Sequence, residues 1–189
     1  IGVQVFGGHG FISEHGMEQI VRDVRISLLY EGTNGIQAND LIGRKLAGSK
    51  GQLVRKYIDQ AEEFCAAISA NSTLAPFAET LKTHLQEWWQ LSQLMLARGK
   101  EDPNFVATAA VDYQEYSGYV VLAYLWARMA AVAADKLANG TNEEAFYKAK
   151  LATARFYYNR LLPRTRSLVV TMQAGSETVM ALSEEEFVF

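Results

Sequence analysis

The sequence predicts an all-α protein built as an antiparallel helical bundle. From Met17 onward, apolar residues recur at the 3.6-residue period of amphipathic helices, and no stretch alternates apolar and polar residues as a half-buried strand does. Short breaks rich in glycine, proline and asparagine separate the periodic stretches, which is typical of sequential helices joined by short loops. With 189 residues, the chain is long enough for one or two domains with a substantial core.

The first domain is expected at residues 1–48. Residues 1–12 indicate a helix end and a glycine-rich loop at 7–10, and a helix then runs from Ser13 to about Leu29. Its inward positions are Met17, Ile20, Val21, Val24 and Leu28. The next helix begins after Thr33, and its inward positions are Ile36, Leu41, Ile42 and Leu46. The Gly-Ser-Lys-Gly stretch at 48–51 is the clearest boundary signal, so we expect a second domain at 51–189.

The second domain is expected to be helical throughout. Its first helix carries an apolar stripe, which runs through Leu53, Val54, Tyr57, Ile58, Ala61, Phe64, Cys65 and Ile68. Further helices are expected at 74–98, 105–138, 141–162 and 165–173, and the tail from residue 176 is either frayed or docked by its aromatic residues. The apolar run at 119–134 contains Arg128 and is shorter than the roughly 20 residues of a membrane span. We therefore expect a central helix buried on all sides, with no membrane span.

Composition argues against several classes of function. Hydrophobic residues make up 49% and charged residues 21% of the chain, and the net charge is −3, with no basic cluster for nucleic-acid binding. Cys65 is the only cysteine, so no intramolecular disulfide can form, and its apolar neighbours indicate an inert buried thiol. The histidines, His9, His15 and His84, lack the spacing of metal ligands, so we expect no metal.

Glu31 is the candidate catalytic residue. It follows the apolar run Leu28-Leu29-Tyr30 and precedes Gly32 and Thr33, at the corner between two expected helices. Partial burial would raise its pKa toward the range useful to a general base. Thr33 or Asn34 can cap the next helix and leave its first N–H groups free for a ligand. The alternative is an ordinary surface turn with one acidic residue.

Three sequence blocks resemble the end of the catalytic core of the acyl-CoA dehydrogenases, a family of flavoproteins. The first is Gln4-Val5-Phe6-Gly7-Gly8-His9-Gly10, the second is Arg22-Asp23-Val24-Arg25-Ile26 and the third is Tyr30-Glu31-Gly32-Thr33. They occur in the family's order and spacing. The rest of the chain resembles, by position and helical character, the C-terminal extension of larger bacterial members. The resemblance implies that the chain is a fragment of a longer enzyme.

The family resemblance implies a role for each matched residue. Glu31 would be the base that removes the α-proton of an acyl-CoA thioester, while FAD takes the β-hydrogen to give a trans-2-enoyl-CoA. Gly32 would meet the thioester through its backbone. The positions expected to contact FAD are Thr33, Asn34 and Gly35, and those expected to contact the FAD of a neighbouring subunit are Gln4, Val5, Phe6, Gly7 and Gly8. Many relatives carry a side chain where this sequence has Gly35. Arg22 and Asp23 are expected to form a structural ion pair.

Two alternatives to an acyl-CoA dehydrogenase of fatty acid β-oxidation remain open at this stage. An acyl-CoA oxidase would share Glu31, and the chain in hand could instead serve only as a helical oligomerisation module. The resemblance also implies an electron-transferring flavoprotein as redox partner and assembly into a homo-oligomer. With no targeting signal in the sequence, we expect a bacterial cytoplasmic location.

Overall fold

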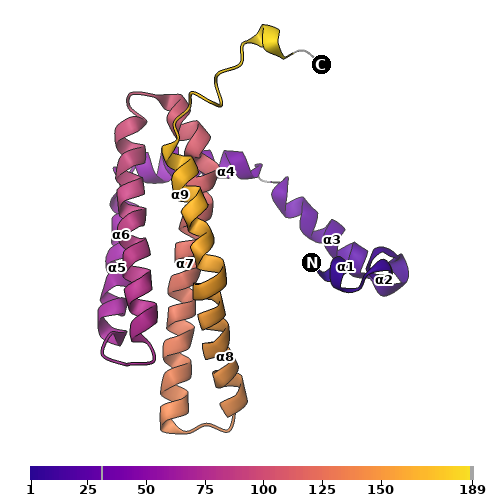
Figure 1. The fold of residues 1–189 in the computed structure, drawn as a ribbon, viewed down its shortest axis with the longest axis vertical. Helices are drawn as coiled ribbons and strands as arrows, with labels where there is room; N and C mark the ends of the chain where they lie inside the picture. Colours follow the sequence, from indigo (N-terminus) through magenta and orange to yellow (C-terminus); the bar gives the residue numbers. More distant parts are fainter. Residues whose placement is uncertain (31, 188–189) are drawn as a thin grey trace. The chain divides into compact units, whose positions relative to one another are not determined.

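The computed structural model describes residues 1–30 and 32–187, and every regular element in that part of the chain is helical (Figure 1). The predicted all-α class is confirmed. Contacts between residues divide the chain into two compact units, residues 1–38 and residues 39–189, which are described separately. The division falls within the helix Asn34–Asp40. The segment that follows this helix, Leu41–Ala47, packs on the bundle of the second unit.

The first unit consists of short helices. They are α1 (Gly2–Val5), α2 (Gly8–Phe11), α3 (Met17–Arg25) and the first residues of α4 (Asn34–Asp40), with 3-10 turns at Ser13–His15 and Ile26–Leu28. The single helix predicted from Ser13 is interrupted because Gly16 has φ +70°, a left-handed conformation that ends the first turn. The loop predicted at 7–10 is in part the helix α2.

Side chains predicted to lie inward in the first unit are exposed. Ile20, Val21 and Val24 form the expected apolar side of α3, yet no described residue covers them. Ile36 on α4 was predicted to be buried and is 60% exposed. The helical period was therefore interpreted correctly, but the burial inferred from it was wrong for these positions. Periodicity shows which side of a helix is apolar and does not show what covers that side.

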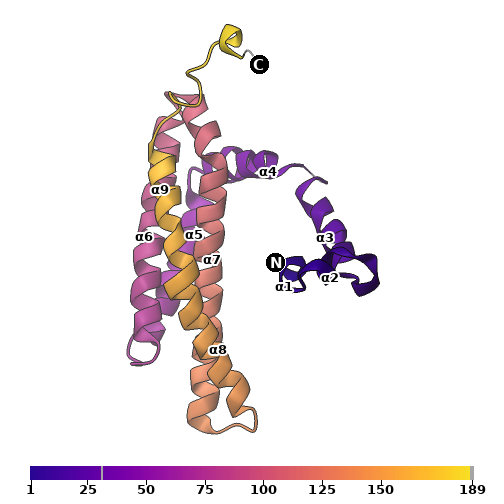
Figure 2. The same cartoon turned by 45° about the vertical axis from the view of Figure 1, so that its right-hand side comes forward.

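The second unit is a four-arm antiparallel bundle. Helices α5 (Gln52–Ile68), α6 (Ala75–Arg98) and α7 (Pro103–Asn139) run alternately up and down (Figure 1). The fourth arm consists of α8 (Glu144–Phe156), a π-helical segment (Tyr157–Leu161), a 3-10 turn (Leu162–Arg164) and α9 (Thr165–Gln173). Figure 2 shows this arm lying along α7, which also contacts α6 and is the central helix. A π-helical segment, Leu41–Ala47, precedes α5 and packs against α5, α6 and α7.

The ends of the bundle helices follow from local chemistry. Asp102 caps α7, since its carboxylate accepts a hydrogen bond from the Asn104 N–H at 2.9 Å, and Pro103 takes the first helical position. Ser176 donates to the same carboxylate at 2.6 Å and so ties the start of the tail to this cap. The Ser176 hydroxyl holds the pKa of Asp102 below its usual value. Gly140, with φ +84°, ends α7.

The core of the bundle combines large side chains of α6 with both small and aromatic side chains of α7. The buried residues of α6 include all six that the sequence placed inward: Phe77, Leu81, Leu85, Trp88, Leu91 and Met95. The buried positions of α7 include many alanines, namely Ala109, Ala110, Ala123, Ala127, Ala130 and Ala133. Tyr113 and Ser92 share a 2.7 Å hydrogen bond between α7 and α6, with both residues fully buried. These contacts satisfy polar groups that would otherwise be buried without a partner.

Two consecutive tyrosines fasten the fourth arm to α7. The Tyr157 hydroxyl donates to the Tyr119 carbonyl at 2.8 Å, and the Tyr158 hydroxyl donates to the Ala123 carbonyl at 2.9 Å. Both tyrosines lie in the π-helical segment. Burial raises the pKa of both hydroxyls, so they remain protonated donors.

Helix α7 has one exposed apolar face, contrary to the prediction that it is buried all round. Leu122, Leu125, Met129 and Val132 are exposed, although the opposite face of the helix is buried against its neighbours. In the described part of the chain, α7 alone is long and apolar enough to cross a membrane by length and composition, with 39% of its most apolar window buried. Core helices of soluble proteins have the same length and composition, so this property is weak support for a span.

Cys65 gives a direct test of the packing of α5. The residue is fully buried, and burial raises the pKa of its thiol from 9.0 to about 11. We expect the folded chain not to react with a disulfide reagent at about pH 8, because the thiolate is the reactive form. Because the folded state favours the neutral thiol, burial of Cys65 stabilises the fold relative to an unfolded chain whose thiol ionises. This stabilisation should be complete below the ordinary pKa of 9.0 and should be lost as the pH rises toward 11. Reaction monitored by absorbance, with denatured chain as control, tests this; rapid reaction of the folded chain would contradict it.

Candidate functional site

The predicted site centres on the corner before α4. Gly32 has φ +105°, and a Cβ there would lie 3.0 Å from the Gln37 Nε2 atom and 3.2 Å from the Ile36 Cγ2 atom. Both the backbone angle and the crowding favour glycine at this position. Helix α4 begins at Asn34, so Thr33 occupies its cap position, and the Thr33 carbonyl accepts a hydrogen bond from the Gln37 N–H at 3.0 Å. Gly35 lies in the first turn, with no neighbour within 4 Å of a would-be Cβ.

Glu31, the predicted base, lies outside the described residues. The three apolar residues before it, Leu28, Leu29 and Tyr30, are exposed. They are available to line a pocket with another surface. The role of Glu31 therefore stays a prediction.

The other predicted cofactor contacts lie on the turn between α1 and α2. Gln4 and Val5 end α1, Phe6 and Gly7 form the turn, and Gly8 begins α2. Gly7 has φ +58°, and no heavy atom lies within 4 Å of a Cβ built on Gly7 or Gly8.

This turn fits contact with a dinucleotide. The Gly10 N–H donates to the Gly7 carbonyl at 3.0 Å, which leaves the N–H groups of Gly8 and His9 as the donors at the start of α2. The open glycine backbone therefore allows close approach, and it presents donors to an oxygen-rich ligand.

Arg22 and Asp23 do not form the predicted ion pair. Arg22 instead pairs with Glu18 at 3.1 Å, and Asp23 accepts a hydrogen bond from the Gln19 amide at 2.7 Å. Adjacent residues on a helix point about 100° apart, whereas residues four apart lie on the same face. These contacts are exposed and lie within α3, so they stabilise the helix itself.

The histidines give no support for a metal site. His9 and His15 lie near each other, with ring centroids 5.1 Å apart, while the His84 Nδ1–H donates to the Thr80 carbonyl at 2.9 Å. Within residues 1–30 and 32–187, no group of three or more His, Cys, Asp or Glu side chains could hold a metal ion.

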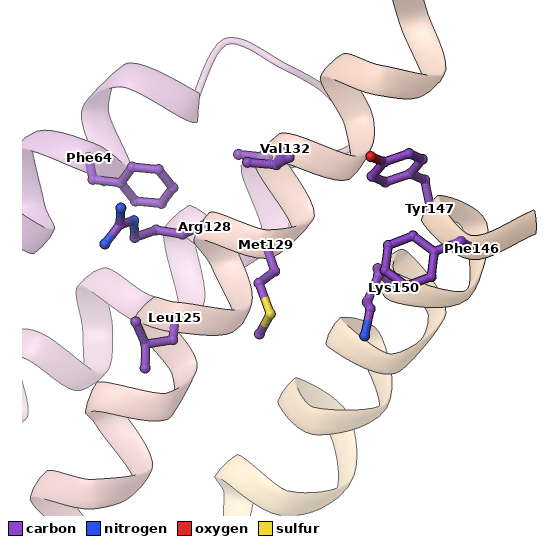
Figure 3. A pocket seen from close by; sticks show the side chains of 9 residues that line it. Phe64, Leu125, Arg128, Met129, Val132, Phe146, Tyr147 and Lys150 are labelled. Atoms are coloured by element: carbon purple, nitrogen blue, oxygen red, sulfur yellow. The ribbon is translucent and has the colours of Figure 1, made fainter. Parts of the chain in front are cut away.

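The sequence did not predict the apolar groove on the bundle. It has a volume of about 610 Å³ and lies over α7, between α5 and α8 (Figure 3). Its lining residues are Phe64, Leu125, Arg128, Met129, Ala131, Val132, Phe146, Tyr147 and Lys150. The alternating three- and four-residue spacing of the exposed residues of α7 was a signal in the sequence, but it was interpreted as part of an all-round buried helix.

Two models of protein families match consecutive parts of the chain. Residues 1–46 match "Acyl-CoA dehydrogenase, C-terminal domain", and residues 56–183 match "Acetyl-CoA dehydrogenase C-terminal like". The first match contains all three of the sequence blocks that resemble the catalytic core. The second covers most of the helical bundle.

Curated relatives are similar over nearly the whole chain. A butyryl-CoA dehydrogenase of Syntrophomonas wolfei is 29% identical over 98% of this chain and 31% of its own length. A 3-methylmercaptopropionyl-CoA dehydrogenase of Ruegeria pomeroyi is 33% identical over 86% of this chain and 28% of its own length. A broad-specificity linear acyl-CoA dehydrogenase of Mycobacterium tuberculosis is 30% identical over 98% of this chain and 32% of its own length.

The chain thus spans about a third of the length of these relatives. The family match covers both units of the structure, the small N-terminal unit and the bundle. This chain belongs to the acyl-CoA dehydrogenase family and corresponds to its C-terminal domains.

Proposed function

We propose that this chain is the C-terminal part of an FAD-dependent enzyme that desaturates acyl-CoA thioesters to trans-2-enoyl-CoA. The observation that carries the proposal is the match of residues 1–46 to the acyl-CoA dehydrogenase C-terminal domain, since these residues contain the Tyr-Glu-Gly-Thr block. The relatives act on butyryl-CoA, 3-methylmercaptopropionyl-CoA and linear acyl-CoAs, as their names state. An acyl-CoA is therefore the proposed substrate class.

In this proposal Glu31 removes the α-proton of the thioester through its carboxylate. Proton transfer requires the carboxylate beside the α-carbon, in surroundings poor in water that bring its pKa close to the working pH. Gly32 lets the substrate approach the backbone, since its φ of +105° and its crowded surroundings favour a residue without a side chain. When bound, FAD supplies the two-electron acceptor that takes the β-hydrogen as hydride.

Two parts of the first unit are proposed to hold the cofactor. Thr33, Asn34 and Gly35 would contact FAD from the start of α4. The turn formed by residues 4–8 would contact the FAD of a neighbouring subunit, with its open glycine backbone as the donor surface. This arrangement implies a homo-oligomer, and an electron-transferring flavoprotein is the proposed electron acceptor.

The test uses the full-length enzyme, purified with its flavin. Under anaerobic conditions, addition of short-, medium- and long-chain acyl-CoAs should bleach the visible flavin absorbance in proportion to substrate. Enoyl-CoA should appear in equal amount, and an artificial acceptor should support turnover. The proposal is overturned if no acyl-CoA reduces the flavin. An oxidase is indicated instead if the reduced enzyme reacts rapidly with O₂ and forms hydrogen peroxide.

The chain of 189 residues by itself is expected to be inactive and colourless. It would lack the remaining surfaces around FAD and so the positioning that supplies about 7–11 kcal/mol of barrier lowering in well-oriented reactions. Turnover or bound flavin in this chain alone would contradict that expectation. The alternative of an oligomerisation module predicts association of this chain without either activity.

A further inference from the structure

The exposed face of α7 has the residue spacing of a helix-pairing surface. Leu122, Leu125, Met129 and Val132 follow one another at intervals of three, four and three residues, and all four are exposed. This is the spacing of the apolar seam in coiled coils. Gly118, four residues before Leu122, is also exposed and continues the same line. We refer to residues 118, 122, 125, 129 and 132 as the α7 seam.

The two halves of the α7 seam differ in shape. Leu125, Met129 and Val132 lie in the apolar groove, while Leu122 and Gly118 do not line it. Figure 3 shows Phe64 of α5 on one side of these residues and Phe146 of α8 on the other. The half of the seam from Leu125 to Val132 therefore lies at the bottom of a groove. The other half carries a leucine, Leu122, one helical turn from Gly118. A leucine can fill such a groove, and a glycine allows two helices to approach closely.

Opposite charges stand at the two ends of the α7 seam. Glu115 lies three residues before Gly118, and Lys136 lies four residues after Val132, so both continue the seam spacing. Both are exposed, and neither makes an ion pair with any other described residue. Between these two residues the helix is about 32 Å long at 1.5 Å per residue.

We propose that the α7 seam pairs with the same seam of a second copy of this chain, antiparallel, about a two-fold axis near Leu125. In this arrangement Leu122 of each copy faces the half of the other seam that lies in the groove. Glu115 of each copy lies within about one helical turn of Lys136 of the other, so one ion pair can form at each end of the interface. A parallel pair would instead bring like charges together at both ends. A two-fold interface of this kind uses one self-complementary surface on both copies.

The groove walls are suited to receive a second helix. Arg128 lies over the ring of Tyr124, with the guanidinium carbon 5.6 Å from the ring centroid, and Lys150 lies 5.0 Å from the ring centroid of Phe146. Both cations are thus held against aromatic rings. This inference concerns assembly and does not depend on the proposed chemistry.

The first experiment measures self-association of the 189-residue chain by sedimentation velocity over a wide concentration range. Leu125→Glu should weaken dimer formation roughly tenfold or more, because it places two carboxylates at the centre of an apolar interface. Val24→Glu is the matched control, since Val24 is an exposed apolar helical residue of the first unit and lies outside the α7 seam. The proposal is overturned if the wild-type chain is a monomer throughout, or if only Val24→Glu weakens association.

Charge reversal tests the antiparallel arrangement. Glu115→Lys or Lys136→Glu alone would place like charges at both ends and should weaken the dimer roughly threefold to tenfold. The double substitution exchanges the two charges, restores both ion pairs and should recover wild-type association. A different partner covering the seam would not produce this recovery. Additive weakening in the double variant would overturn the antiparallel pairing.

A disulfide gives an independent measure of the two-fold axis. Leu125→Cys introduces the one accessible thiol among the described residues, because Cys65 is fully buried. Near a two-fold axis, the two copies of residue 125 can come within the roughly 4.4–6.8 Å between Cα atoms that a disulfide needs. Mild oxidation should then give a covalent dimer, whereas Leu53→Cys on the exposed side of α5 should not. Equal cross-linking of both variants would contradict the proposal.

Discussion

Glu31→Gln in the full-length enzyme is expected to lower kcat by about 10²–10⁴-fold, the loss typical of removing a general base. Glutamine fills nearly the same volume but cannot accept the α-proton. The fold and flavin content should persist, because Gly32 and Thr33, which set the corner and the start of α4, are unchanged. Acceptor-coupled turnover and the flavin-to-protein ratio should be measured together.

The matched control for this prediction is Glu14→Gln, which makes the same change at an exposed acidic residue of the first unit. It should leave turnover unchanged. Flavin reduction by a stopped-flow method separates loss of the chemical step from loss of substrate binding. Turnover near the wild-type level in Glu31→Gln would show that another residue is the base, while flavin loss would show that the position is structural.

Leu85→Ala is expected to destabilise the bundle by about 2–5 kcal/mol, through lost burial and the cavity left behind. Leu85 is 0% exposed at the centre of α6. Leu53→Ala is the control, since Leu53 is 55% exposed on α5, and it should change stability by about 0.5 kcal/mol or less. Urea unfolding at one fixed protein concentration, monitored by far-UV circular dichroism, measures both. Equal losses in the two variants would contradict the placement of α6.

The sequence allowed the bundle to be predicted well where large apolar residues face inward. The inward positions of α6 agree with the structure, and the last helix has the predicted bounds, Thr165–Gln173. Large apolar side chains at a regular period leave few choices of buried face. The helices predicted at 74–98 and 105–138 also agree with the bounds of α6 and α7 to within two residues, because glycine and proline at the breaks end or start helices.

Helix α7 shows why the rest was not predictable. Its buried face carries small residues such as Ala127 and Ala130, while larger residues such as Leu125 and Met129 are exposed. Hydropathy does not distinguish two apolar faces, and side-chain size would suggest the wrong one. The buried face is set by how α7 packs against its neighbours α6, α8 and α9, which is a property of the assembled core.

The candidate site was predicted mainly from family resemblance. The positive φ of Gly32, +105°, is a finding of the structure that the sequence did not predict. The physical argument from the residues alone could not distinguish Glu31 from an ordinary surface acid. Catalytic function depends on the surfaces that enclose the carboxylate, and one helical corner of the sequence contains no information about them.

The hydrogen bonds of Tyr157 and Tyr158 have a mechanical consequence for the bundle. Their acceptors, the carbonyls of Tyr119 and Ala123, lie four residues apart along α7. Apolar ridges alone can let one helix slip along another, but a slip of one residue, about 1.5 Å, would lengthen and weaken both hydrogen bonds together. The axial register of the fourth arm on α7 is therefore set by two directional contacts as well as by apolar packing.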